Sequence, residues 1–233
     1  MVNKFLYRDQ LSSSFGIYIS GPAVYNAPER DEEVIEIPGR NGSLTIDNGR
    51  FKNIDVRYPA FIRREFRKAA EAARQWLLFK SGYSRLEDSY DPDFFRFARF
   101  KGPIDFDMRF LNLSGEMELI FDCMPQRFYK PGQYAEKITG KSRILNPFKF
   151  ESLPLIRVYG KEGSVWINGD EIRLKKIDEY VDIDCETQNA YKEMESKNEE
   201  VSHTFPALKQ GINEIEFSSR IDFLEITPRW WQI

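Results

Sequence analysis

The chain has 233 residues, of which 41% are hydrophobic and 30% charged, and its formal net charge is −3. This length suits two ordinary domains or one large β domain, and the acidic balance argues against a protein whose main task is to bind nucleic acid. No apolar run approaches the roughly 18 residues of a membrane span. Because residues 1–8 lack the apolar core of a signal peptide, we expect neither a membrane span nor secretion by a cleaved signal.

The N-terminal part begins with runs that predict β-strands, at residues 15–20 and 31–37. Residues 37–44 then read Ile-Pro-Gly-Arg-Asn-Gly-Ser-Leu, and their glycines, proline and asparagine predict a sharply turned connection. Beyond it, Leu44-Thr45-Ile46 is apolar and β-prone. Residues 52–58 alternate between apolar and polar side chains, as in a half-buried strand.

The apolar period predicts one long helix that begins near Ile62. Its apolar side chains form one stripe at the 3.6-residue period, Pro59 is well placed at the entry, and Gly82 as a left-handed terminator. Burying this stripe cannot by itself offset the cost of ordering the backbone, so we expect the helix to lie across a sheet. The stripe comprises Ile62, Phe66, Ala69, Ala70, Ala73, Trp76 and Leu77.

A basic cluster falls at the start of this helix and comprises Arg63, Arg64, Arg67 and Lys68. Cations at this end of a helix oppose the helix dipole, so we expect packing or a partner to hold them. Nucleic acid is an alternative partner, which the acidic remainder of the chain disfavours.

Two more strands are predicted at residues 94–100 and 116–123. In the second, apolar side chains share one face, and three of the four intervening residues are acidic, as in a sheet with one wet face. Lys130-Pro131-Gly132 indicates a linker. We therefore divide the chain into an α+β domain, residues 1–135, and a second domain, residues 136–233.

The second part is predicted to be all-β. Asn168-Gly169 lies between two β-prone runs and is a strong signal for a tight hairpin. Residues 193–200 are polar and charged and predict an exposed loop. Short strands between regular turn signals suggest a β-sandwich. The remaining strand-like runs are residues 155–159, 180–183, 213–217 and 221–227.

Few side chains predict catalysis or metal binding. His203 is the only histidine, which excludes a site with two or three histidines within one chain, and no G-x-S-x-G motif exists. Asp182 and Asp184 flank Ile183 and have the spacing to share a proton or a cation, but the wet side of a strand is the more economical interpretation. We therefore expect no enzyme, no cofactor and no metal.

Two further candidates are interpreted structurally. Asp88, Asp91 and Asp93 lack the glycine of an EF-hand loop, so we interpret Asp91-Pro92-Asp93 as a turn before the strand at residue 94. The two cysteines, Cys123 and Cys185, lie far apart in the sequence, and we expect both to be reduced.

Seven motifs, in the same order along nearly the whole chain, resemble those of the distal tail protein family of long-tailed bacteriophages and prophages. They are residues 37–44, Asp91-Pro92-Asp93-Phe94-Phe95-Arg96, residues 121–127, Asn146-Pro147 with residues 153–160, residues 184–191, Gly211-Ile212-Asn213, and Pro228-Arg229-Trp230-Trp231.

This resemblance implies an N-terminal α+β domain, a sheet with one long helix, that closes into a hexameric ring, followed by an all-β, galectin-like sandwich outside the ring. It implies a structural hub at the virion tail tip, made in the bacterial host cytoplasm. The implied partners are other copies of the chain, the tail tube protein, the tail-associated or tail fibre protein and a peripheral receptor-binding protein. Neither a membrane nor a specific nucleic acid is among them.

Two other function classes stay open. The first is a stand-alone carbohydrate-binding module, although Asn146-Pro147-Phe148 lacks the arginine of a galectin-type sugar site. The second is a hydrolase of cell-wall glycan that uses two carboxylates, which no motif supports.

Within the ring, we expect the segment from Pro38 to Asp55 to form an arm or hairpin that contacts the neighbouring subunit. Its apolar residues lie between turns dense in Gly, Asn and charge, and an exposed strand edge requires a dedicated partner. The alternative is an ordinary hairpin folded back on its own sheet. The interface candidates are Pro38, Gly39, Arg40, Leu44, Ile46 and Phe51.

Overall fold

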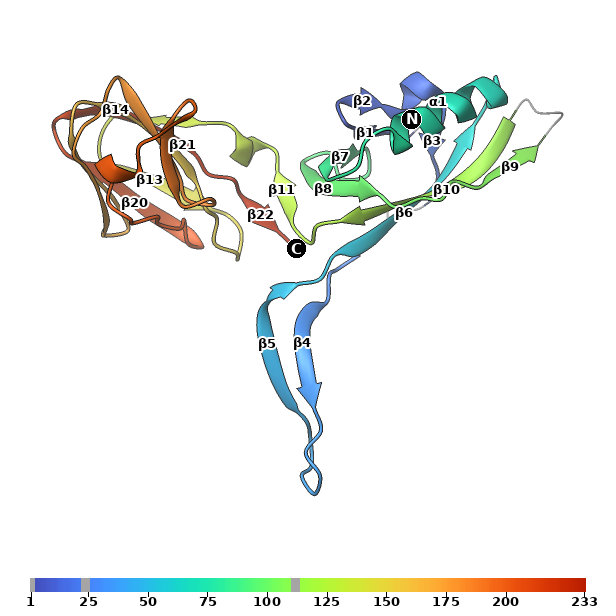
Figure 1. The fold of residues 1–233 in the computed structure, drawn as a ribbon, viewed down its shortest axis with the longest axis horizontal. Coiled ribbons are helices and arrows are strands. Elements are labelled where there is room, and N and C mark those ends of the chain that lie inside the picture. The colour runs from blue at the N-terminus through green and yellow to red at the C-terminus, as the bar shows by residue number, and fades with distance from the viewer. Residues whose placement is uncertain (1–2, 22–25, 110–113) are drawn as a thin grey trace. The chain divides into compact units, whose positions relative to one another are not determined.

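The computed structural model describes residues 3–21, 26–109 and 114–233, and its contacts divide the chain into two compact units (Figure 1). Unit 1 comprises Met1–Arg127 together with Ile233, and unit 2 comprises Phe128–Gln232. Both units are mostly β, and the α-helical content of the described residues is the single helix α1, Phe66–Leu78. The division into domains at residue 135 stays a prediction.

A curled antiparallel sheet forms the body of unit 1. Its strands follow the order β2-β1-β7-β8-β10-β6-β3, and β9 pairs with β10. The sheet curls so far that the Ile19 N–H, on the edge strand β3, donates to the Asn3 carbonyl at 3.0 Å. The strands are β1 (Phe5–Tyr7), β2 (Gln10–Leu11), β3 (Ile17–Ile19), β6 (Ile54–Ile62), β7 (Ser84–Asp88), β8 (Phe94–Phe100), β9 (Phe106–Arg109) and β10 (Ser114–Cys123); the short 3-10 helix η1 covers Ser12–Phe15.

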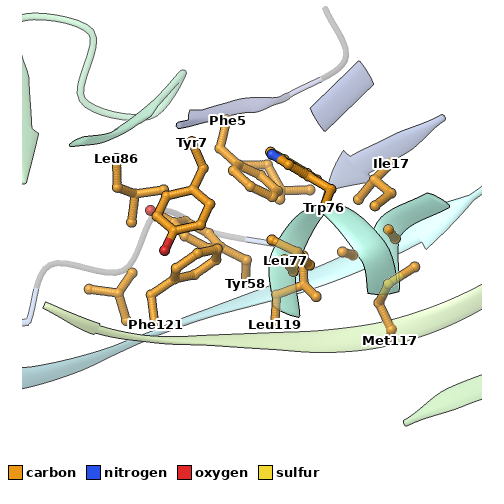
Figure 2. Packing of buried hydrophobic residues seen from close by; sticks show 14 of the residues in the cluster. Phe5, Tyr7, Ile17, Tyr58, Trp76, Leu77, Leu86, Met117, Leu119 and Phe121 are labelled. Atoms are coloured by element: carbon orange, nitrogen blue, oxygen red, sulfur yellow. The ribbon is translucent and has the colours of Figure 1, made fainter. Parts of the chain in front are cut away.

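Helix α1 lies over this sheet and completes an aromatic core (Figure 2). Trp76 stacks on Phe5 and Phe15, with ring centroids 5.6 and 4.3 Å apart, and Phe121 meets Tyr7 edge-on at 5.1 Å. Each large side chain that is fully buried contributes roughly 1.5–3 kcal/mol. Much of the aromatic content of unit 1 therefore serves the core. The buried helix residues are Phe66, Ala70, Ala73, Trp76 and Leu77.

The helix begins four residues later than the period predicted. Ile62 is the last residue of β6, where it lies opposite both Ile17 and Gly115, and Pro59 lies inside the same strand. Pairing on two sides holds this segment in the sheet. Glu65, with a φ of 49°, then turns the chain into the helix. Gly82 does have a φ of 91°, but it lies beyond the end of the helix at Leu78.

Two sheets enclose the core of unit 2, as expected for a β-sandwich. One has the order β12-β21-β14-β17-β18-β19 and the other β13-β20-β15-β16. Buried side chains of both sheets, such as Ile156, Val158, Val165 and Ile215, belong to one apolar cluster. The strands are β12 (Glu136–Ile138), β13 (Ser142–Asn146), β14 (Leu155–Gly160), β15 (Gly163–Ile167), β16 (Asp170–Leu174), β17 (Tyr180–Asp184), β18 (Asn189–Lys192), β19 (Glu195–Ser196), β20 (Gly211–Phe217) and β21 (Ile221–Thr227).

The sequence predicted the tight hairpin at residues 168–169 of unit 2 but not the structure of residues 193–200. Asn168 and Gly169, with φ of 52° and 92°, join β15 to β16 in the expected tight hairpin. Residues 193–200, expected to be a loop, instead contain β19 and the 3-10 helix η3 (Asn198–Glu200), because Tyr191 pairs with Ser196. Unit 2 also contains the 3-10 helix η2 (Pro131–Gln133) and the strand β22 (Trp231–Gln232). The strand β11 (Arg127–Tyr129), which pairs with β22, begins at Arg127, the last residue of the first segment of unit 1.

Candidate assembly surface

The segment with the predicted interface residues forms a two-stranded sheet of its own, which we call the arm. It comprises β4 (Arg30–Ile35), β5 (Leu44–Phe51) and the connection between them. Most of its residues are exposed, and Figure 1 shows it leaving the sheet of unit 1 at the start of β6. The alternative, a hairpin folded back on its own sheet, does not describe this geometry.

One face of the arm carries an apolar stripe. Ile35 lies opposite Leu44, and Glu33 lies opposite Ile46. Since side chains two apart on a strand share a face, Ile35, Leu44 and Ile46 lie together. Between 37 and 44% of each of these three residues is exposed, so the stripe is uncovered. Its counterpart on the other face is Val34, which lies opposite Thr45.

Ion pairs join the two strands near the base of the arm. Arg30 pairs with Asp47 at 3.1 Å, and Arg50 with Asp31 at 2.6 Å. The hydrogen bond from Arg50 lowers the pKa of the Asp31 carboxyl below its ordinary value. An isolated two-stranded hairpin is only marginally stable in water even with such pairs, so an uncovered apolar stripe on it favours a binding partner.

The structure brings some of the predicted interface residues together and separates others. Leu44 and Ile46 share the stripe, whereas Phe51 is half-buried at the base, where the Arg30 guanidinium lies 4.8 Å from its ring centre. Pro38, Gly39 and Arg40 lie in the exposed connection, where the Arg40 N–H donates to the Ile37 carbonyl at 3.1 Å.

Sequence reasoning missed Ile35 as a member of the stripe. Its position follows only from the strand register, which sets it opposite Leu44. Pairing outward from the turn at residues 37–44, with alternation on both strands, is the signal that would have found it.

A second surface of unit 1 is a groove of about 500 Å³ between the start of α1 and the segment from η1 to β3. We call it the basic groove, because Arg63, Arg64 and Lys68 line it. Arg63 lies over the rings of Tyr18 and Phe61, at 5.6 and 5.3 Å from their centres. Its apolar lining comes from Phe15, Tyr18, Ala69 and Ala72.

Charges in and beside the basic groove are poorly balanced. Glu65 also lines the groove and pairs with Lys68 at 3.7 Å, but Arg63, Arg64 and Arg67 form no ion pair with any residue that the structure describes. All four basic side chains are exposed. The groove is therefore a cationic surface with an apolar lining, suited to an acidic and partly apolar partner.

The carboxylates that sequence analysis weighed for chemistry are held in ion pairs. Asp182 and Asp184 do not lie on a wet face, since only 3% and 7% of these residues are exposed. Two hydrogen bonds from Arg157, at 2.7 and 2.8 Å, hold Asp182. Arg229 donates to Asp184 at 2.6 Å and, although burial opposes the effect, lowers the pKa of that carboxyl.

The other candidates have structural environments as well. Asp88 accepts the Tyr90 and Asp91 N–H groups at 2.8 and 3.0 Å and the Tyr58 hydroxyl at 2.5 Å, within the turn that precedes β8. His203 is exposed, and Cys123 and Cys185 are buried free thiols. Among the described residues, no cluster of three His, Cys, Asp or Glu side chains has the geometry to hold a metal ion. The described helices include none long and apolar enough to cross a bilayer.

Comparison with known proteins supports the fold and gives it a context. No protein-family model matches the sequence, and no curated protein is significantly similar to it. Solved structures with this arrangement do exist, and the three described below come from bacteriophages. One is the Dit protein (gp19.1) of phage SPP1, described as a paradigm of the hub of the adsorption apparatus in phages that infect Gram-positive bacteria.

The likeness to SPP1 Dit covers 100% of both chains, with a TM-score of 0.76 at 11% sequence identity. Chains of the phage p2 baseplate in its activated conformation, with Ca or with Sr, match over 97% of both chains, with a TM-score of 0.55 at 10 and 11% identity. The chain therefore has the fold of phage Dit and baseplate proteins, which confirms at the level of structure the resemblance found in the seven sequence motifs.

Proposed function

We propose that this chain is a structural subunit of a phage tail tip, a hub on which the tail tube and the host-binding parts meet. The observation that carries the proposal is the end-to-end likeness to SPP1 Dit, which includes both units and leaves no part of either chain unmatched. A hub of this kind works by binding and geometry, so the role requires no catalytic residue. The paired carboxylates and buried thiols agree with a non-enzymatic protein.

In this proposal unit 1 closes into a ring, expected to be a hexamer, and the galectin-like sandwich of unit 2 lies outside it. The ring binds the tail tube protein on one side and the tail-associated or tail fibre protein on the other, and unit 2 offers a site for a receptor-binding protein. The uncovered stripe on the arm supports subunit contacts, since such a surface would otherwise promote aggregation.

Immunogold labelling of phage particles that carry this chain tests the role directly. An antibody raised against the purified chain is expected to decorate the tail tip at one position, next to the end of the tube. An antibody against the tail tube protein, which should label along the tail, is the matched control. Gold along the tube, on the head or on no particle would contradict the proposal.

A further inference from the structure

The strand β4 of the arm carries acidic side chains that the arm itself leaves unpaired. Asp31 and Asp47 have arginine partners within the arm, whereas Glu32, Glu33 and Glu36 have no basic partner among the described residues. Glu33 shares a face with the apolar stripe, because it lies two residues from Ile35 and opposite Ile46. The exposed end of the arm thus combines apolar side chains with unpaired carboxylates.

The basic groove has the complementary composition. Its arginines lack acidic partners among the described residues, and aromatic and alanine side chains supply its apolar lining. Complementary charge fixes the orientation of a contact and excludes wrong partners, while apolar burial supplies most of the affinity. The arm and the basic groove each carry both charged and apolar side chains.

An arm has no access to the groove of its own chain. It leaves the sheet of unit 1 at the start of β6 (Figure 1), whose first residue is Ile54. The helix side of the groove begins just beyond the last residue of β6, Ile62, at Arg63. At about 3.3 Å per residue, these nine residues separate the two by roughly 25–30 Å. The arm also extends away from the sheet, so a basic groove that it reaches belongs to another copy.

We infer that the arm of one copy docks into the basic groove of the next copy. Glu33, which shares the face of the apolar stripe, then faces Arg64, and the stripe covers the lining of the groove. The two surfaces are different patches at opposite ends of one strand, so the contact is heterologous, and such contacts close into a ring when the rotation allows. The inference rests on the proposed ring and names the contact that builds it.

A charge-swap experiment tests this contact. One variant carries Glu33→Lys in the arm, and the other carries Arg64→Glu in the groove. We expect each alone to need at least a tenfold higher concentration than the wild type to assemble, as measured by mass photometry. An equal mixture should assemble at nearly the wild-type concentration, because in a ring of alternating copies every arm meets a groove of opposite charge.

The matched control is Lys80→Glu, an equal charge change just after the same helix but outside the groove, which should assemble like the wild type. Single variants that assemble normally, or a mixture that fails to recover, would overturn the inference and leave the proposed hub in place. If the wild type itself forms no closed oligomer, the proposed ring fails together with this contact.

Disulfide trapping keeps the test decisive if a charge variant does not fold. Chains with Glu33→Cys and chains with Arg64→Cys are mixed and oxidised, and we expect a covalent pair of one chain of each kind. The native thiols are buried and do not interfere. Glu33→Cys mixed with Met194→Cys, a fully exposed position in unit 2, is the control and should give no such pair. Absence of the trapped pair at concentrations where the wild type assembles overturns the inference.

Discussion

At the scale of single residues, two arginines make it feasible to bury two carboxylates on β17. Arg157 meets Asp182 through two hydrogen bonds, and this contact raises the pKa of the guanidinium. Arg229 does the same for Asp184 from the segment after β21. A buried carboxylate without such a partner would be strongly destabilising. These pairs thus belong to the stability of unit 2 and not to a catalytic site.

Replacing Arg157 with Met should destabilise the chain by about 2–3 kcal/mol, because it leaves Asp182 buried without its partner. The figure is below the roughly 3–5 kcal/mol of a fully buried pair, since 38% of the Arg157 side chain is exposed. Arg143→Met is the matched control: its pair with Glu214 is exposed, and the loss should be about 0–1 kcal/mol. Equal losses in urea unfolding of the two variants would contradict the account.

Both cysteines should be inert while the chain is folded. Burial raises the pKa of Cys123 to about 12, and that of Cys185 to about 12. A thiol-reactive dye at pH 8 is therefore expected to label neither thiol in the native protein and both thiols in urea. Fast labelling of the native chain, or a disulfide between the two thiols on a non-reducing peptide map, would show that this description of the thiols is wrong.

The raised pKa values of the two thiols determine how the unfolding free energy depends on pH. Thiols in the unfolded chain ionise near pH 9, whereas the buried ones stay protonated until about pH 12. Their contribution to the unfolding free energy is complete below about pH 9 and falls as the pH rises from there towards 12.

At the scale of elements, a glycine in the sheet sets how closely α1 can approach. A Cβ atom on Gly115 of β10 would lie 2.2 Å from the Phe66 ring and 2.8 Å from the Asp107 carbonyl. Since Phe66 is 3% exposed, its ring has little room to move. The close contact of α1 with the sheet therefore requires that residue 115 has no side chain.

Gly115→Ala should cost about 1–3 kcal/mol, as expected when extra volume is forced into a packed core. Gly140→Ala is the matched control, because a Cβ there meets no atom within 4 Å. Thermal unfolding should distinguish the two variants by several degrees. If both variants unfold at the wild-type temperature, the packing of the Phe66 ring does not require a glycine at residue 115.

The arm is the element on which the proposed assembly depends. Replacing Leu44 and Ile46 with Asp should abolish ring formation and leave each subunit folded, because both side chains are already exposed. Their burial belongs to an interface of at least about 1,000 Å² per contact. Val34→Asp with Thr45→Asp alters the opposite face of the arm and is expected to preserve assembly. Full rings of the Leu44 and Ile46 variant at the wild-type concentration, or its unfolding, would refute the role of the stripe.

Local sequence signals predicted the elements that are locally determined. The stripe from Phe66 to Leu77, the hairpin at Asn168-Gly169 and the strand at residues 221–227 all follow from period or turn chemistry. The start of the helix did not, because Ile62 takes part in long-range pairing with Gly115 and Ile17. Short strands such as β1 and β12 escaped prediction for the same reason: partners distant in the sequence, β7 and β21, determine them.

The candidate site was only partly predictable. The turn and the apolar residues of β5 are visible in the sequence, whereas Ile35 requires the register and the basic groove requires the fold. The ion pairs of Asp182 and Asp184 on β17 were missed because a buried ion pair and a wet strand face have the same alternating pattern in the sequence.

At the scale of the whole molecule, the chain shares its fold with SPP1 Dit along its entire length, and we propose that it is a ring subunit whose arm and basic groove complement one another. Such a subunit is expected to reach a finite size, because a heterologous contact that closes into a ring leaves no arm or groove unoccupied. A carbohydrate-binding module or a hydrolase has no such requirement and works as a single copy.

The mass of the purified chain in solution, measured over a range of concentrations, tests this claim most directly. The account predicts that the 27.5 kDa chain gives way, as concentration rises, to one closed species of about six copies, with no larger species beyond it. A single copy at every concentration, or a ladder of sizes without an end point, would contradict it.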